Sequence, residues 1–200
     1  MRLSCILIIV LFSATTTISY AQNDIETTRV QAMSIIKQIG LKYSTAEVPA
    51  SVSSGQSVSS IPLLEQISKT VVNSKMFEGA YRASKSILAG TEGGVSYRDY
   101  GNLVQPLLAE ASILKDTAIT PEEKLLAQTY VDAADIYAAT GRLWSATLGY
   151  DVDAQSAPWA LARTIVTSAN EAYLRSYRLE LSPQPQPTPS KKAKRSSMQH

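Results

Sequence analysis

Two acidic residues three positions apart, Asp132 and Asp135, have the type and spacing that most directly suggest chemistry. Because a helix turns once in about 3.6 residues, both would lie on nearly the same helix face. Paired carboxylates can act as general acid and base, and Glu171 could supply a third group. A glycan-cleaving hydrolase would need two of them about 5–10 Å apart in a cleft. The alternative, which we favour, is a solvated helix face.

A second acidic pair, Asp151 and Asp153, superficially resembles the start of a calcium-binding loop. The EF-hand pattern requires Gly at its sixth position and Glu at its twelfth, where this chain has Ser156 and Ala162. Helical di-metal sites also use Glu-x-x-His motifs, and the only histidine is His200. We therefore predict no metal site and no cofactor.

Large aromatic residues are numerous, with ten Tyr and two Trp against two Phe. Tyr and Trp combine an apolar body with a polar edge, which suits cores, protein interfaces and sugar-stacking grooves. We expect most of them in the core. The candidates for a partner surface are Trp159, Trp144, Tyr97 and Tyr100. Trp159 is the best candidate for exposure, because it lies in the first turn of a predicted helix beside a loop.

The end of the chain combines a proline-rich segment with a basic cluster. Alternate prolines from Pro183 to Pro189 favour an extended, disordered tail. The cluster that follows consists of Lys191, Lys192, Lys194 and Arg195. This tail could contact an anionic surface such as an envelope polymer or phospholipid, or could serve only as a solubilising terminus.

The distribution of charge argues against specific nucleic-acid binding. The net charge is +2, but residues 22–190 carry 14 basic and 17 acidic side chains, a net charge of −3. The single cysteine, Cys5, and the single histidine, His200, lie near opposite ends of the chain. A disulfide scaffold, a cysteine nucleophile and a histidine-centred triad are therefore excluded, and no phosphate loop or dinucleotide fingerprint occurs.

The first 21 residues have the pattern of a secretion signal. Arg2 precedes an apolar run over residues 5–12, and Ser19 and Ala21 provide the small residues of a cleavage site before Gln22. A membrane-spanning helix needs about 20 apolar residues, so an uncleaved anchor is the weaker alternative. We expect a periplasmic or extracellular protein.

Apolar residues at helical spacing, without a convincing strand, predict an all-α fold. The predicted helices cover residues 23–43, 61–89, 96–115, 120–148 and 156–179. Asn73 marks a break in the second, Gly90 its C-cap, and Ser96 and Thr120 the N-caps of the third and fourth. In the first helix, Val30, Met33, Ile36 and Tyr43 form the predicted apolar stripe, which Ile35 and Ile39 widen.

We expect an irregular bundle of four to five helices with a disordered, Pro-rich, basic C-terminal tail; a helical-repeat array is the alternative. The predicted organisation is a signal peptide (1–21), an N-terminal helix (22–44), a Ser-rich linker (45–60), a helical domain (61–181) and the tail (182–200).

Two neighbouring segments carry a resemblance to known sequences. The first is Gly93-Gly94-Val95-Ser96-Tyr97-Arg98-Asp99-Tyr100, and the second is a Pro-capped helix with Tyr130, Ala133, Tyr137, Gly141 and Leu143-Trp144. Together, within residues 75–150, they resemble a group of small, uncharacterised exported bacterial all-helical proteins. The resemblance implies a bacterial envelope setting; it implies no activity and no catalytic residues.

These observations favour a non-enzymatic binding or assembly module of the cell envelope, whose partner is a protein or an envelope polymer. One alternative is an envelope hydrolase that uses only carboxylates to cleave glycans. Another is a component of a secretion system or pilus. The oligomeric state is left open.

Overall fold

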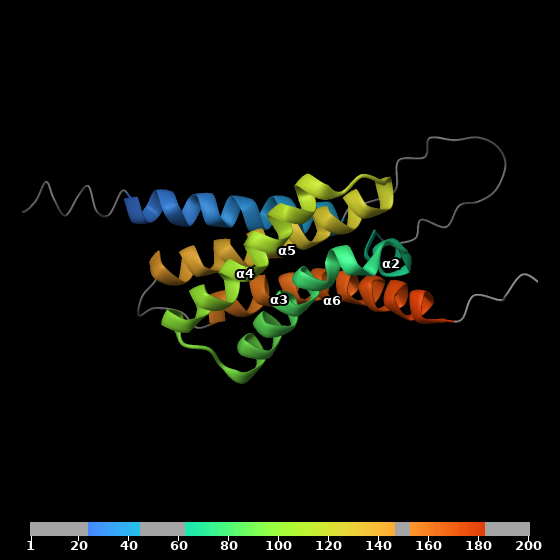
Figure 1. The fold of residues 1–200 in the computed structure, drawn as a ribbon. Coiled ribbons are helices and arrows are strands. Elements are labelled where there is room, and N and C mark those ends of the chain that lie inside the picture. Colours follow the sequence, from blue (N-terminus) through green and yellow to red (C-terminus); the bar gives the residue numbers. More distant parts are fainter. Residues whose placement is uncertain (1–23, 45–62, 147–152, 183–200) are drawn as a thin grey trace, which may run out of the picture.

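The computed structural model describes residues 24–44, 63–146 and 153–182, and the regular structure in these ranges is entirely helical (Figure 1). A helix over residues 24–44 comes first. The others are α2 (Leu63–Lys69), α3 (Ser74–Gly93), α4 (Tyr97–Thr117), α5 (Pro121–Ala146) and α6 (Asp153–Leu181). The predicted all-α class is confirmed.

Several predicted features lie outside the described residues. They are the signal peptide with its cleavage site before Gln22, the Ser-rich linker, Asp151 of the acidic loop, and the basic cluster of Lys191, Lys192, Lys194 and Arg195.

Helices α3 to α6 form a bundle in which each helix runs antiparallel to the next. Rings of Tyr97 and Trp144 pair α4 with α5, and rings of Trp144 and Trp159 pair α5 with α6. Helix α6 also packs antiparallel on α3, where Tyr81 stacks on Tyr173. The four helices therefore enclose one core, which α2 extends by packing on α6.

The start of each of α3, α4 and α5 follows from a local cap. The side chain of Asn73 accepts a hydrogen bond from the Lys75 N–H, which confirms the predicted break before α3. Ser96 caps α4 as predicted. At α5 the capping box is reciprocal: Thr120 Oγ1 accepts from the Glu123 N–H, and the Glu123 carboxylate accepts from the Thr120 N–H.

Helix α3 ends later than predicted, because Gly90 is not its C-cap. The helix continues to Gly93, and Gly94 leaves it with a φ of +80° that suits glycine. Gly90 instead permits close packing of α4: a methyl group there would lie 2.3 Å from Leu103 Cδ1. Helix α6 also begins at Asp153, three residues before the predicted Ser156.

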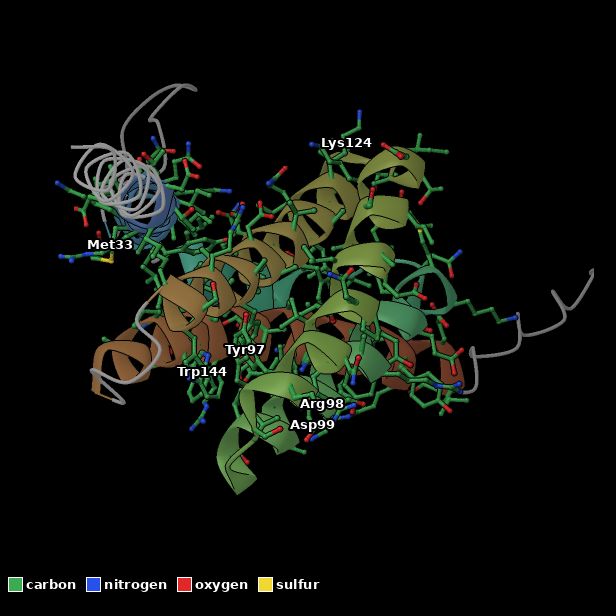
Figure 2. The ribbon with its side chains drawn as sticks, turned by 90° about the vertical axis from the view of Figure 1, so that its left-hand side faces the viewer. Met33, Tyr97, Arg98, Asp99, Lys124 and Trp144 are labelled. Atoms are coloured by element: carbon green, nitrogen blue, oxygen red, sulfur yellow. The ribbon has the colours of Figure 1, made fainter. Side chains whose placement is uncertain are left out.

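The N-terminal helix (blue in Figure 1) lies beside α5. Its buried face contains Ala32, which packs against Ala139 and Leu143, with Ile36 alongside. The predicted apolar stripe is wrong at two positions, since Val30 is 58% exposed and Met33 is 52% exposed. Met33 points away from the bundle (Figure 2). The buried face lies on the other side of the helix from those two residues and is centred on Ala32, because alanine is small enough for close approach of two helices.

Candidate functional site

The four aromatic residues predicted as a partner surface come together in one cluster at the junction of α4, α5 and α6. Trp144 lies at the centre, with its ring centroid 5.4 Å from that of Tyr97, 5.6 Å from that of Tyr100 and 5.7 Å from that of Trp159. Figure 2 shows Tyr97 and Trp144 side by side. We call these four residues the aromatic cluster.

Tyr100 anchors the cluster through its hydroxyl. It accepts a hydrogen bond from the Trp159 indole N–H at 3.0 Å and donates one to the Tyr137 carbonyl at 2.7 Å. Burial raises the pKa of the Tyr100 phenol, so the group stays neutral and can donate. Trp159 is thus half-buried, and the exposed member of the cluster is Tyr97, with 42% of its surface accessible. Our choice of Trp159 as the best exposed candidate is wrong.

A surface cleft of about 580 Å³ lies between α4 and α5 and includes two members of the cluster, Tyr97 and Tyr100. Its lining also includes three charged side chains and one amide, namely Arg98, Asp135, Arg142 and Gln105. Small residues leave room between them, namely Gly101, Ala138 and Gly141. We call this space the α4–α5 cleft.

The antiparallel register of α4 and α5 places the polar groups of the cleft at two levels. Tyr97 contacts Trp144, and Tyr100 is the nearest neighbour of Gly141. In this register Arg98 lies within one residue of the level of Arg142, an axial offset of about 1.5 Å. Gln105 and Asp135 share a second level, seven residues or about 10 Å farther along.

The two glycines of the cleft have different surroundings. A methyl group at Gly101 would meet no atom within 4 Å, so this position opens into free space. A methyl group at Gly141 would lie 3.1 Å from Cε1 of Tyr100. Gly141 therefore lets the Tyr100 ring lie against α5, whereas Gly101 keeps the cleft open.

The α4–α5 cleft has more positive than negative groups. Within the described residues, the guanidinium groups of Arg98 and Arg142 form no hydrogen bond and no ion pair. Burial and the neighbouring Asp132 raise the pKa of Asp135, an effect that Arg142 and Lys115 oppose. Two arginines without an ion pair, beside one half-buried carboxylate, leave the cleft with a net positive charge that favours an anionic ligand.

The three carboxylates considered for acid–base chemistry occupy different places. Asp135 lines the α4–α5 cleft, and Glu171 lines a separate cleft between α3 and α6. Asp132 lies under the N-terminal helix, so our interpretation of it as part of a solvated face is wrong: only 5% of the residue is exposed. These three carboxylates therefore do not converge in one cleft.

Asp132 instead accepts three hydrogen bonds. Its Oδ2 accepts from the Lys42 ammonium group and, at 2.8 Å, from the Tyr43 hydroxyl. Its Oδ1 accepts from the Gln128 amide at 2.8 Å. Asp132 thus holds the N-terminal helix on α5 and is not available for chemistry.

Two further observations concern metals and membranes. In residues 24–44, 63–146 and 153–182, no three acidic, histidine or cysteine side chains gather closely enough to hold a metal ion. No helix in this part of the chain has both the length and the apolar composition to cross a bilayer.

The comparisons with protein-family models, curated proteins and solved structures found no match to this chain.

The sequence indicated the four aromatic residues as candidates for a partner surface but neither their clustering nor the polar residues beside them, apart from Asp135. A signal was present, because Arg98 and Gln105 are seven residues apart, and so are Asp135 and Arg142. Seven residues are almost two helical turns, so each pair shares a helix face. Only the register shows that the two faces oppose each other.

Proposed function

We propose that the protein is exported and acts as a non-enzymatic binding module of the bacterial cell envelope, with the α4–α5 cleft and the aromatic cluster as its binding surface. One observation carries the proposal: the exposed Tyr97 ring lies at a cleft with two unpaired guanidinium groups. Exposed aromatic groups next to a few convergent polar groups are typical of binding sites.

The partner is an envelope polymer or an envelope protein. In this proposal the basic cluster of Lys191, Lys192, Lys194 and Arg195 adds a weak contact with an anionic surface. Four charges give little affinity alone at physiological salt, so the main specificity lies in the cleft.

The test of the binding surface uses a substitution that fills the cleft. Gly101→Leu adds a side chain where free space exists, and it removes a helical glycine at the same time. Gly93→Leu is the matched control, because a methyl group at Gly93 also meets no atom within 4 Å and this residue does not line the cleft. The immobilised protein is exposed to purified peptidoglycan and to solubilised envelope proteins.

The expected result is that the original protein and Gly93→Leu retain the same envelope component, whereas Gly101→Leu retains at least tenfold less. Equal retention by all three proteins would show that the cleft is not the binding surface. Export is tested separately by the intact mass of the protein from the envelope, which should correspond to a chain that begins at Gln22. A mass that includes residues 1–21 contradicts cleavage.

A further inference from the structure

The α4–α5 cleft has the features of a site for a short, acidic carbohydrate. We propose that it binds a glycan that carries carboxylates, with a sugar ring against Tyr97 and a carboxylate at Arg98 and Arg142. This inference rests on the proposed function and specifies its ligand.

A pair of guanidinium groups favours an anion in the cleft. Arg98 from α4 and Arg142 from α5 line the same cleft at nearly the same axial level, and neither forms an ion pair within the described residues. Arg142 acts on the Asp135 carboxylate beyond ion-pair distance. A guanidinium group presents parallel N–H donors that match the two oxygens of a carboxylate. An anion at this level would therefore find donors on both sides of the cleft.

The opposite end of the cleft carries groups that can pair with sugar hydroxyls. Gln105 offers an amide donor and an acceptor, and Asp135 offers acceptor oxygens when it is ionised. Sugar hydroxyls both donate and accept, so they pair with such a set more completely than apolar ligands do. The distance of about 10 Å between the two levels suits an oligosaccharide of a few rings.

The Tyr97 ring and the free space next to it form a surface for a sugar ring. Tyr97 is 42% exposed, and its ring makes an edge-type contact with Trp144 at 70°, which holds it in place. The C–H face of a sugar ring is apolar and can pack on such an aromatic surface. Gly101 leaves the adjacent space free, so a ring can approach the backbone of α4.

The charge of the site favours an acidic glycan over a neutral one. Arg98 and Arg142 outnumber the single carboxylate of Asp135, and Lys115 is close enough to Asp135 to influence it. Asp99, which follows Arg98, accepts from the Ser96 hydroxyl and belongs to the helix cap. A peptide with acidic side chains would contact the same arginines. It would have no sugar ring to pack on Tyr97 and no sugar hydroxyls to bond with Gln105.

The experiment measures tryptophan emission during titration, because both tryptophans of the chain belong to the aromatic cluster. The probes are trigalacturonic acid, its neutral trimethyl ester and triglutamate, each at concentrations up to about 10 mM. Trigalacturonic acid should shift the emission saturably and bind at least tenfold more tightly than the other two. Arg98→Gln and Arg142→Gln should each weaken it about tenfold, whereas Arg82→Gln, on the surface of α3, should leave it unchanged.

Each alternative outcome overturns a stated part of the proposal. If the neutral ester bound as tightly as trigalacturonic acid, recognition of a carboxylate would be rejected. If triglutamate bound as tightly, recognition of a carbohydrate would be rejected. Absence of binding by emission and calorimetry, or unchanged affinity in both arginine variants with native circular dichroism, rejects the acidic glycan altogether. The retention experiment with Gly101→Leu is independent of these probes, so a failure here leaves the proposed binding surface standing if that experiment succeeds.

Discussion

The carboxylate of Glu180, near the end of α6, caps the start of α3 at Ser74. One oxygen accepts a hydrogen bond from the Ser74 backbone N–H at 2.8 Å, and the other accepts from the Ser74 hydroxyl. The first turn of a helix has N–H groups without partners inside the helix, and a carboxylate is stabilised there. A residue 106 positions away thus supplies a cap for α3 and holds the end of α6 against the start of α3.

Replacement of Glu180 should change how the melting temperature of the protein depends on pH in the acid range. The hydroxyl and the N–H of Ser74 lower the pKa of Glu180 in the folded protein. The contribution of this carboxylate to the free energy of unfolding is therefore fully present above the unfolded-state pKa of about 4.3, and it is lost as the pH falls through the lower folded-state pKa. Because the carboxylate is exposed, Glu180→Gln should cost at most about 1 kcal/mol at pH 7. The measurement is the melting temperature between pH 7 and pH 3.

The control for this prediction is Glu171→Gln, which alters an exposed carboxylate on the same helix. This variant should melt close to the original protein at every pH. If the difference between Glu180→Gln and the original protein stayed constant down to pH 3, Glu180 would not be the titrating cap.

Replacement of Asp132 should release the N-terminal helix without unfolding the bundle. Asp132→Ala leaves the Lys42 ammonium and the Tyr43 hydroxyl without their acceptor. The cost of breaking a buried ion pair is reduced here because the Lys42 side chain is 41% exposed, and we expect about 2 kcal/mol. Hydrogen exchange should accelerate in residues 24–44 and stay slow in α5. Equal acceleration in both segments would contradict a local role.

The helix caps could be predicted because they depend on neighbouring residues. Thr120 and Glu123 are three positions apart and bond each other, and Ser96 caps its own helix. Asn73 marks the start of α3 in the same way. Gly90 and Gly94 could not be distinguished from the sequence, because the role of Gly90 depends on Leu103 in the next helix.

The environments of Asp132 and Asp135 could not be predicted, because each depends on a distant segment. Residues three apart differ by about 60° around a helix axis. That difference turns Asp132 toward the N-terminal helix, whose Lys42 lies 90 positions away, and leaves Asp135 at the α4–α5 cleft. The helical spacing correctly predicted that the two residues lie on neighbouring parts of one helix surface. It contained no information about which other helices would cover that surface.

A methyl group at Gly141 should disturb the aromatic cluster. Gly141→Ala gains about 1 kcal/mol of helix propensity, but its methyl group would approach Cε1 of Tyr100 to 3.1 Å. Because two hydrogen bonds hold the Tyr100 hydroxyl, its ring cannot move freely. We expect altered tryptophan emission and no gain in melting temperature. Gly93→Ala, which adds a methyl group in open space, should keep the emission and gain stability.

Removal of the Tyr100 hydroxyl should test whether the cluster depends on its hydrogen bonds. In Tyr100→Phe the buried ring stays, but the Trp159 N–H loses its acceptor and the Tyr137 carbonyl loses a donor. A partly buried donor without a partner costs about 1–3 kcal/mol, which corresponds to several degrees in melting temperature for a chain of this size.

The matched variant is Tyr97→Phe, because the Tyr97 hydroxyl forms no hydrogen bond within the described part of the chain and the residue is 42% exposed. It should melt within about 1 °C of the original protein, since surface substitutions away from specific contacts have small effects. Tryptophan emission should change in Tyr100→Phe, because the indole of Trp159 becomes free to bond water or to move. If the two variants had the same stability and emission, the bonds of Tyr100 would not hold the cluster, and packing of the four rings alone would have to position Tyr97 at the cleft.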